Sequence, residues 1–402
     1  MSSLQYRKTR FVCVSDTHNT SPESGAFKLP KGDVLIHAGD LTKQGTYAEL
    51  HKTLDWIESA DFEEKIVIAG NHDITLDSDW YAEHGLYHHN QYPQDAAACS
   101  RLLKNRPIRY LNHESAVITL KRDSGPRTTF KIFGSPYSPA RGLWAFGYQP
   151  EAASALWGQI PLDVDITVTH TPPQYHCDES RDRGAAGCES LRQALWRVRP
   201  QLAICGHVHE GRGAERICWD LDSPNVKYKE GTTGYWTEPD PGSKKQCLLD
   251  LTTKGPAPLQ NTRTVDPSTL ANASKGYDTS QTSRAGPSGL WKPKEHSPWP
   301  SYADDAETNA PLRGTIGRSS SSEMAELVPA TRGQGGAPPS GRCDLEALSG
   351  RLGRQETCII NAAIMASSWP HRAITGRKYN KPFVVDIELP TWESLTRLRP
   401  DD

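Results

Sequence analysis

Five short apolar runs in this chain each end in side chains that bind metal ions, and this feature restricts the possible folds most strongly. In chain order the runs and the residues after them read FVCVSDTH, VLIHAGD, IVIAGNHD, ITVTH and LAICGHVH. Short runs rich in Val and Ile are typical of buried strands. In an open α/β sheet, ligands bind beyond the carboxyl ends of the strands. The pattern therefore predicts that oxygen and nitrogen donors from five strands meet at one edge of a sheet.

Between about Arg10 and Trp219, β-branched runs alternate with stretches of helical composition, which is typical of layered α/β folds. We predict strands at Phe11–Ser15, Val34–Ala38, Lys65–Ala69, Ala116–Leu120, Phe130–Gly134, Ile166–Thr169 and Leu202–Cys205. We predict helices at Thr46–Ala60, Ala96–Asn105, Glu151–Gln159 and Glu189–Val198, where apolar residues recur every three or four positions. The fold class predicted from this alternation is α/β.

The composition changes in the second half of the chain. Thr253–Gly341 is rich in Ser, Pro, Gly, Asn and Thr and has few branched aliphatic residues. Such a segment does not bury enough apolar surface to offset the entropy lost on ordering. We therefore predict a folded core over residues 1–252, a disordered Ser/Pro/Gly-rich insertion over residues 253–350, and returning strands over residues 351–402.

Two segments near the end of the chain have strand composition, Thr357–Met365 and Phe383–Leu389. Two isolated strands are only marginally stable in water. We therefore expect both to complete the sheet built by residues 10–219, with the insertion looped out between them. A long surface loop is compatible with this arrangement, because the entropy of loop closure rises only logarithmically with length.

Charge and cysteine content limit the partners and the compartment. The 402 residues carry a formal net charge of -2, so no overall positive field attracts a nucleic acid polymer or an anionic membrane. The nine cysteines form no CxxC pair, and several lie inside apolar runs, as expected for reduced, buried thiols. The chain also has no apolar run long enough for a signal peptide or a membrane span. We expect a cytoplasmic protein without a membrane or nucleic acid partner.

The donors after the five runs are oxygen and nitrogen ligands rather than thiolates. Asp40 and Asn71 each follow a glycine, which lets the backbone approach an ion closely. The complete set of candidate donors is Asp16, His18, Asp40, Asn71, His170, His207 and His209. Carboxylate, amide and imidazole donors together suit Mn²⁺, Fe or Zn²⁺. Each motif alone is common in turns, but all five in order indicate a metal site.

The five blocks SDTH, AGD, GNHD, VTH and GHVH resemble those of the calcineurin-like metallophosphoesterases, which run D-x-H, GD, GNH[DE], H and GHxH. The stretches THTPPQYHCD, GCESL, INAAIMA and KPFVVDIEL are similar to the smaller group of metallophosphoesterase domain-containing proteins, many of them fungal. The resemblance covers roughly residues 10–219 and 356–390. It implies a four-layer α/β/β/α sandwich with two mixed β-sheets, interrupted here by the long low-complexity insertion.

The resemblance also implies a role for each donor. One metal ion would be held by Asp16, His18, His209 and Asp40, and a second by Asn71, His170, His207 and the same Asp40. His72 would be the catalytic histidine. Two divalent or trivalent ions, with Mn²⁺ favoured and Fe or Zn²⁺ as alternatives, would activate a bridging hydroxide and neutralise the attacking and leaving oxygens.

The substrate expected from these motifs is a small phosphate ester. Protein Ser/Thr phosphatases of this superfamily carry GDxxDRG, whereas this chain has GDLTKQG and lacks the second acid and the arginine that grips a phosphomonoester. This difference favours a phosphodiesterase acting on a nucleotide or cyclic nucleotide. We predict that Asn71, His72 and His176 contact the substrate.

Two other functions are compatible with parts of the sequence. The first is a non-catalytic regulatory protein that binds metal or nucleotide, whose insertion recruits protein partners of unknown identity. The complete donor set together with His72 favours an enzyme over this reading. The second is a DNA nuclease, which the acidic charge balance disfavours.

Overall fold

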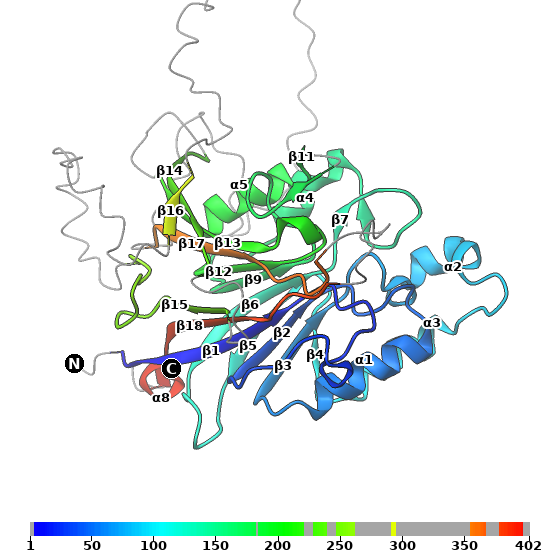
Figure 1. Cartoon of the computed structure of the whole chain (residues 1–402), viewed down its shortest axis with the longest axis horizontal. Helices are drawn as coiled ribbons and strands as arrows, with labels where there is room; N and C mark the ends of the chain where they lie inside the picture. The colour runs from blue at the N-terminus through cyan, green and yellow to red at the C-terminus, as the bar shows by residue number, and fades with distance from the viewer. Residues whose placement is uncertain are drawn as a thin grey trace, which may run out of the picture.

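The computed structural model describes residues 4–181, 184–220, 228–238, 247–261, 291–294, 354–366 and 378–396. Two sheets pack face to face and helices cover their outer sides, which gives a four-layer α/β/β/α sandwich (Figure 1). Both sheets are mixed, because each contains parallel and antiparallel pairs. The predicted fold class is confirmed. Most of the predicted insertion lies outside the described residues.

The first sheet has six strands in the order β15-β18-β1-β2-β3-β4. These strands are β1 (Tyr6–Val14), β2 (Val34–Ala38), β3 (Glu64–Ile68), β4 (Arg109–Tyr110), β15 (Cys247–Asp250) and β18 (Phe383–Pro390). Its outer face is covered by α1 (Tyr47–Ser59), α2 (Ser78–His88) and α3 (Ala96–Lys104). Helix α1 begins with a capping box between Thr46 and Glu49, which satisfies amide groups at its first turn.

The second sheet has eight strands in the order β16-β14-β13-β17-β12-β9-β6-β5. They are β5 (Glu114–Thr119), β6 (Thr129–Ser135), β9 (Ile166–Thr169), β12 (Leu202–Cys205), β13 (Gly213–Trp219), β14 (Glu230–Trp236), β16 (Trp291–Pro293) and β17 (Glu356–Asn361). Helices α4 (Ala153–Trp157) and α5 (Glu189–Val198) cover its outer face. Smaller elements are β7 (Ser138–Pro139), β8 (Gly147–Tyr148), β10 (Glu179–Ser180), β11 (Gly184–Ala185) and α8 (Trp392–Thr396).

Three apolar clusters fill the spaces between the four layers. The first contains residues of both sheets, such as Ile36 and Ile204, and lies between them. The second joins the six-stranded sheet to its helices and includes Leu50 and Leu54 of α1. The third includes Trp196 of α5 and lies against the eight-stranded sheet. Since each layer buries an apolar face on a neighbour, the sheets and helices hold the strand ends in fixed relative positions.

The seven strands predicted between residues 10 and 219 are all present, and β2, β9 and β12 have the predicted bounds. Strand β1 begins at Tyr6 instead of Phe11, because its polar first half pairs with β18. The expectation that both returning strands complete one sheet was wrong. Strand β17 lies between β12 and β13, whereas β18 lies between β1 and β15 of the other sheet. All six residues of β17 are buried, as expected for a strand inside a sheet with both faces covered.

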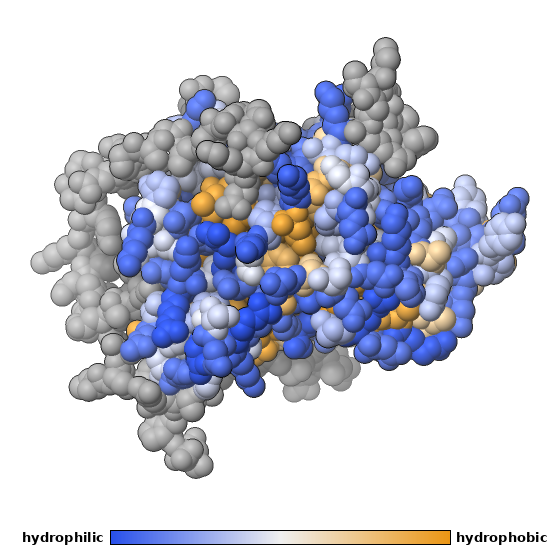
Figure 2. All heavy atoms as spheres, turned by 60° about the horizontal axis from the view of Figure 1, so that its bottom comes forward, coloured by the Kyte–Doolittle hydropathy of each residue, from blue (hydrophilic) through white to orange (hydrophobic). Residues whose placement is uncertain are grey.

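Parts of the predicted insertion are described and contact the core. In residues 253–261, Ala257 is buried and Leu259 packs against the cluster between the sheets. Strand β16 pairs with the edge of β14. Figure 2 shows a face whose described surface is mainly hydrophilic, with smaller apolar areas between. Within the described residues, no helix is long and apolar enough to cross a membrane.

Candidate metal centre

The turns that carry the candidate donors follow strands β1, β2, β3, β9 and β12. Several of these donors adopt a left-handed backbone conformation, with φ of 51° at Asp16, 42° at His18, 54° at Asp40 and 65° at His207. Residues other than glycine adopt such angles rarely, and they persist where the surrounding structure enforces them. Such strained turns occur preferentially at binding and catalytic sites.

Asp16, His18 and His209 form the first group of donors. Their ligand atoms all lie within 4.8 Å of one another, and the three side chains are buried. Nε2 of His209 lies 3.3 Å from Oδ1 of Asp16 and 3.3 Å from Nε2 of His18. Two imidazole nitrogens and one carboxylate oxygen therefore face the same small volume, and this donor set suits a divalent cation.

Asp40 connects this group to a second one. Its Oδ2 lies 3.6 Å from Nε2 of His18, and its Oδ1 lies 3.3 Å from Nε2 of His170. Donor atoms of Asp16, Asp40 and His170 also lie within 4.8 Å of one another. Because the two oxygens of Asp40 face different histidines, this carboxylate has the geometry to bridge two cations.

Asn71 and His207 complete the side of the cluster around His170. Oδ1 of Asn71 lies 3.0 Å from Nε2 of His170 and 2.8 Å from Nδ1 of His207. The amide oxygen offers a ligand without adding negative charge, which suits a site that accepts an anion. The structure therefore brings all seven candidate donors together.

Backbone carbonyls fix the proton positions of two rings. Nδ1 of His18 lies 3.0 Å from the carbonyl oxygen of Thr42, and Nδ1 of His170 lies 3.0 Å from that of Ala38. A carbonyl only accepts, so each Nδ1 donates a proton, and Nε2 of each ring presents a lone pair to Asp40 whenever that ring is neutral. A lone pair facing a carboxylate oxygen is repulsive unless a cation or a proton lies between them. The residues present thus fit a pair of metal ions.

The pKa values of these two histidines shift in opposite directions. Burial lowers the pKa of His18 to about 4, which keeps its ring neutral and able to bind a cation. Burial alone would also lower the pKa of His170, but the carboxylate of Asp40 outweighs it and raises that pKa to about 9. A metal ion at this position therefore has to displace a proton from His170, so its affinity should rise with pH.

His72 lies at the exposed side of the cluster. One of its ring nitrogens is within 4.8 Å of donor atoms of His18 and Asp40. Nδ1 donates to the carbonyl oxygen of Lys43 at 2.7 Å, and the backbone N–H donates to Oδ1 of Asp40 at 2.9 Å. The ring of Trp144 lies over it, with centroids 3.9 Å apart and planes inclined by 33°. These contacts fix the orientation of the imidazole ring.

Asp73 holds two of the donor turns together, a role that sequence reasoning missed. Its carboxylate accepts from the backbone N–H of Leu41, Thr42 and Gly70 at 2.8 to 3.1 Å. The only signal in the sequence was its place in the GNHD block. Gly70 also allows close approach, since a Cβ there would overlap Oδ1 of Asp40.

His176 lies outside the donor cluster, and its predicted contact with substrate stays a prediction. Its ring nitrogens lie 2.8 Å from Oε2 of Glu215 and 3.0 Å from Oε1 of Glu230, and the residue is 2% exposed. Both ring nitrogens are thus engaged by carboxylates of the protein itself. The sequence showed a histidine near a donor, but not the two glutamates that come from distant strands.

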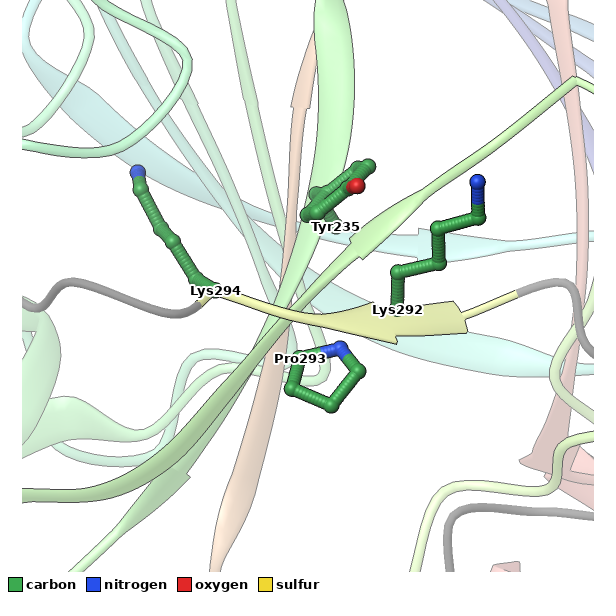
Figure 3. Close-up of a pocket in the computed structure, with 4 residues that line it drawn as sticks. All are labelled: Tyr235, Lys292, Pro293 and Lys294. Carbon is green, nitrogen blue, oxygen red and sulfur yellow. The ribbon is translucent and has the colours of Figure 1, made fainter.

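A pocket of about 410 Å³ lies elsewhere, at the β14–β16 edge of the eight-stranded sheet. Figure 3 shows Lys292 and Lys294 on either side of Tyr235, with Pro293 on the opposite side of the strand. None of these residues belongs to the donor cluster. The pocket therefore adds nothing to the metal centre.

The sequence model of the calcineurin-like phosphoesterases matches residues 9–211 of the chain. A probable rhamnogalacturonate lyase C of Emericella nidulans is 44% identical over 214 residues, which are 53% of this chain and 18% of that protein. The human metallophosphoesterase domain-containing protein 1 is 39% identical over 212 residues, which are 51% of this chain and 62% of that protein. The chain thus covers less than two thirds of either relative. The match to the solved structure of the purple acid phosphatase PPD1 from yellow lupin covers 62% of this chain and 43% of the lupin chain. The sequence identity is 14% and the TM-score is 0.31.

Proposed function

Because the chain belongs to the calcineurin-like phosphoesterase family, as its five motifs predicted, we propose that it hydrolyses a small phosphodiester at a pair of metal ions. The observation that carries this proposal is the position of Asp40, whose two carboxylate oxygens face His18 and His170. Donors on both sides of one carboxylate support a two-metal site rather than a single ion.

In this proposal each metal ion has its own donors. Asp16, His18 and His209 hold one ion, and Asn71, His170 and His207 hold the other, with Asp40 shared. Mn²⁺ is the metal we propose, because it accepts mixed oxygen and imidazole donors. Bound ions of this kind supply a nucleophile from water and neutralise charge on the attacking and leaving oxygens.

We assign His72 to the leaving oxygen of the substrate. Since Nδ1 donates to Lys43, Nε2 is the ring atom that remains for the substrate. A proton held at Nε2 can pass to the leaving alkoxide, a step that contributes about 10² to 10⁴ in rate. The amide of Asn71 would lie beside the bound phosphate.

The preference for a diester rests on the turn after β2. Lys43 and Gln44 stand where the GDxxDRG motif has its second acid and its arginine. In the structure Lys43 contributes its carbonyl group to His72, and Gln44 N donates to Glu49 at 3.2 Å. A phosphodiester carries one negative charge rather than two, so it depends less on such an arginine. Nucleotide and cyclic nucleotide esters are the substrate class we propose.

The test is hydrolysis of bis-p-nitrophenyl phosphate by the full chain with and without Mn²⁺. We expect Asp40→Asn to abolish turnover and His72→Ala to lower kcat by about a hundredfold or more. Asp55→Asn and His51→Ala change exposed residues of α1 and serve as matched controls. No p-nitrophenol release by a folded, Mn²⁺-loaded wild-type protein would contradict the proposal. Nucleotide binding without product would then favour the regulatory alternative.

We also propose a reducing compartment such as the cytoplasm. Among the described residues, eight cysteines are free thiols and seven of these are buried. Free thiols persist in compartments that keep cysteine reduced. Microscopy of a tagged full chain that places it in the secretory pathway would contradict this proposal.

A further inference from the structure

The candidate metal donors lie on separate loops of the two sheets. A four-residue segment lies between two of these loops and forms hydrogen bonds to both. The loop with Asp16 and His18 follows β1 of the six-stranded sheet, and the loop with His207 and His209 follows β12 of the eight-stranded sheet. The joining segment, Asn361–Ile364, begins at the last residue of β17 and is called the cross-sheet segment here.

The cross-sheet segment forms backbone hydrogen bonds to both sides. On the β1 side, Ser15 N donates to the carbonyl of Ala362 at 2.9 Å, and Ile364 N donates to the carbonyl of Ser15 at 2.9 Å. On the β12 side, Ala362 N donates to the carbonyl of Cys205 at 2.9 Å. Ser15 directly precedes Asp16, and Cys205 lies two residues before His207. The segment therefore fixes the distance between the two donor loops.

The side chain of Asn361 adds a second connection to the β12 loop. It is fully buried, and its Nδ2 donates to the carbonyl of Val208 at 2.8 Å and to that of Cys177 at 2.9 Å. Its Oδ1 accepts from Ala363 N at 3.2 Å. Val208 lies between the two histidine donors, so this hydrogen bond holds the loop at its centre.

The loop needs such support because its backbone is strained. His207 has φ of 65°, an angle that residues with a Cβ adopt rarely and at a cost in free energy. Its N–H donates to Asp16 at 3.0 Å. Without the amide of Asn361, the carbonyl of Val208 would keep only the N–H of Gly211, and the buried carbonyl of Cys177 would lose a donor, which is costly. The loop would relax toward other conformations and carry both histidines away from the cluster.

We propose that Asn361 is a positioning residue of the metal centre, which sets the distance of His207 and His209 from Asp16 and His18. The proposal rests on the proposed function, because it requires that the cluster binds metal ions. Asn361 lies outside the residues that match the family model, 9–211. In this proposal the metal centre depends on a segment that follows residues 253–350 in the sequence.

The experiment compares Asn361→Ala with Asn380→Ala in the full chain. Asn380 is a matched control, because its Nδ2 donates at 3.1 Å to the carbonyl of Ala363 in the same segment, but the described contacts of its side chain include none to the β12 loop. Mn²⁺ affinity is measured by isothermal titration calorimetry, and folding is checked by circular dichroism. Loss of a residue that orients metal ligands costs about 10- to 100-fold in affinity. We expect this loss for Asn361→Ala and less than about a threefold change for the control.

Catalysis supplies a second readout, since excess Mn²⁺ should restore most of the activity of Asn361→Ala. If that variant does not fold, Asn361→Ser keeps one donor and should show an intermediate affinity. Affinity equal to wild type in the folded variant, or equal losses in both alanine variants, would overturn the positioning role. A folded wild-type protein that binds no Mn²⁺ would instead contradict the proposed function itself.

Discussion

Replacing His176 with glutamine tests the buried charge network next to the β12 side of the candidate metal centre. His176 lies between Glu215 and Glu230, which also bind Lys294 and Arg192 respectively. Burial by itself lowers the pKa of His176, but the hydrogen bonds and charges of the two glutamates outweigh burial and raise this pKa from 6.5 to about 9. The folded protein therefore holds the imidazolium proton more strongly than the unfolded chain does.

The difference between the folded and unfolded pKa of His176 contributes to the free energy of unfolding. A pKa raised from 6.5 to about 9 corresponds to about 3 kcal/mol of unfolding free energy. Because the folded value is the higher one, His176 contributes this stability in full below about pH 6.5 and loses it as the pH rises through about 9. We expect the stability advantage of wild type over His176→Gln to fall by about 3 kcal/mol between about pH 6 and about pH 10.

The assay is urea unfolding followed by tryptophan fluorescence at several pH values, with a chelator present so that metal binding does not contribute. His51→Gln is the control, because the side chain of His51 is 48% exposed on α1. Its unfolding free energy should follow that of wild type across the whole range. Parallel curves for wild type and His176→Gln would refute the reasoning, since they would mean that His176 has the same pKa in the folded and unfolded chain.

Three further predictions concern the site and its support. Trp144→Ala should lower kcat for bis-p-nitrophenyl phosphate by about tenfold or more, because His72 loses the ring that packs on it; Tyr92→Ala, at a residue 78% exposed, should leave kcat unchanged. Lys294→Met should lower the unfolding free energy by about 1 to 3 kcal/mol, measured in urea, because Glu215 loses a cation 3.0 Å away. Chelation should lower the melting temperature of the full chain in differential scanning calorimetry, and added Mn²⁺ should restore it.

The candidate donors could be predicted from the sequence because each lies within four residues of the end of a buried strand. The strands after which Asp16, Asp40 and Asn71 follow are parallel neighbours, so their carboxyl ends meet at one edge without any long-range information. His170 and His207 follow a second parallel pair. Where a candidate ligand closely follows a short apolar run, the local sequence pattern is enough to place that ligand at the end of a strand.

Other features depend on contacts that no local pattern reports. Strand β17 has the composition of any buried strand, and its place depends on long-range pairing with β12 on one side and β13 on the other. His176 reads as a loop histidine near His170, but the side chains that engage it come from β13 and β14. In the sequence, Asn361 is a polar residue at the end of the apolar run CII. Its donors reach carbonyls more than a hundred residues earlier in the chain, so its role becomes visible only in the folded structure.

The division of the donors between the two sheets suggests why this centre can tolerate strained turns. Asp16, His18, Asp40 and Asn71 come from the six-stranded sheet, and His170, His207 and His209 come from the eight-stranded sheet. A cation bound between them would attract both groups and hold the sheet edges together at the place where the cross-sheet segment holds them by hydrogen bonds. Ion binding and sheet packing would then stabilise the same geometry. Sheet packing would offset part of the backbone strain at positions such as His207, and ion binding would offset more of it.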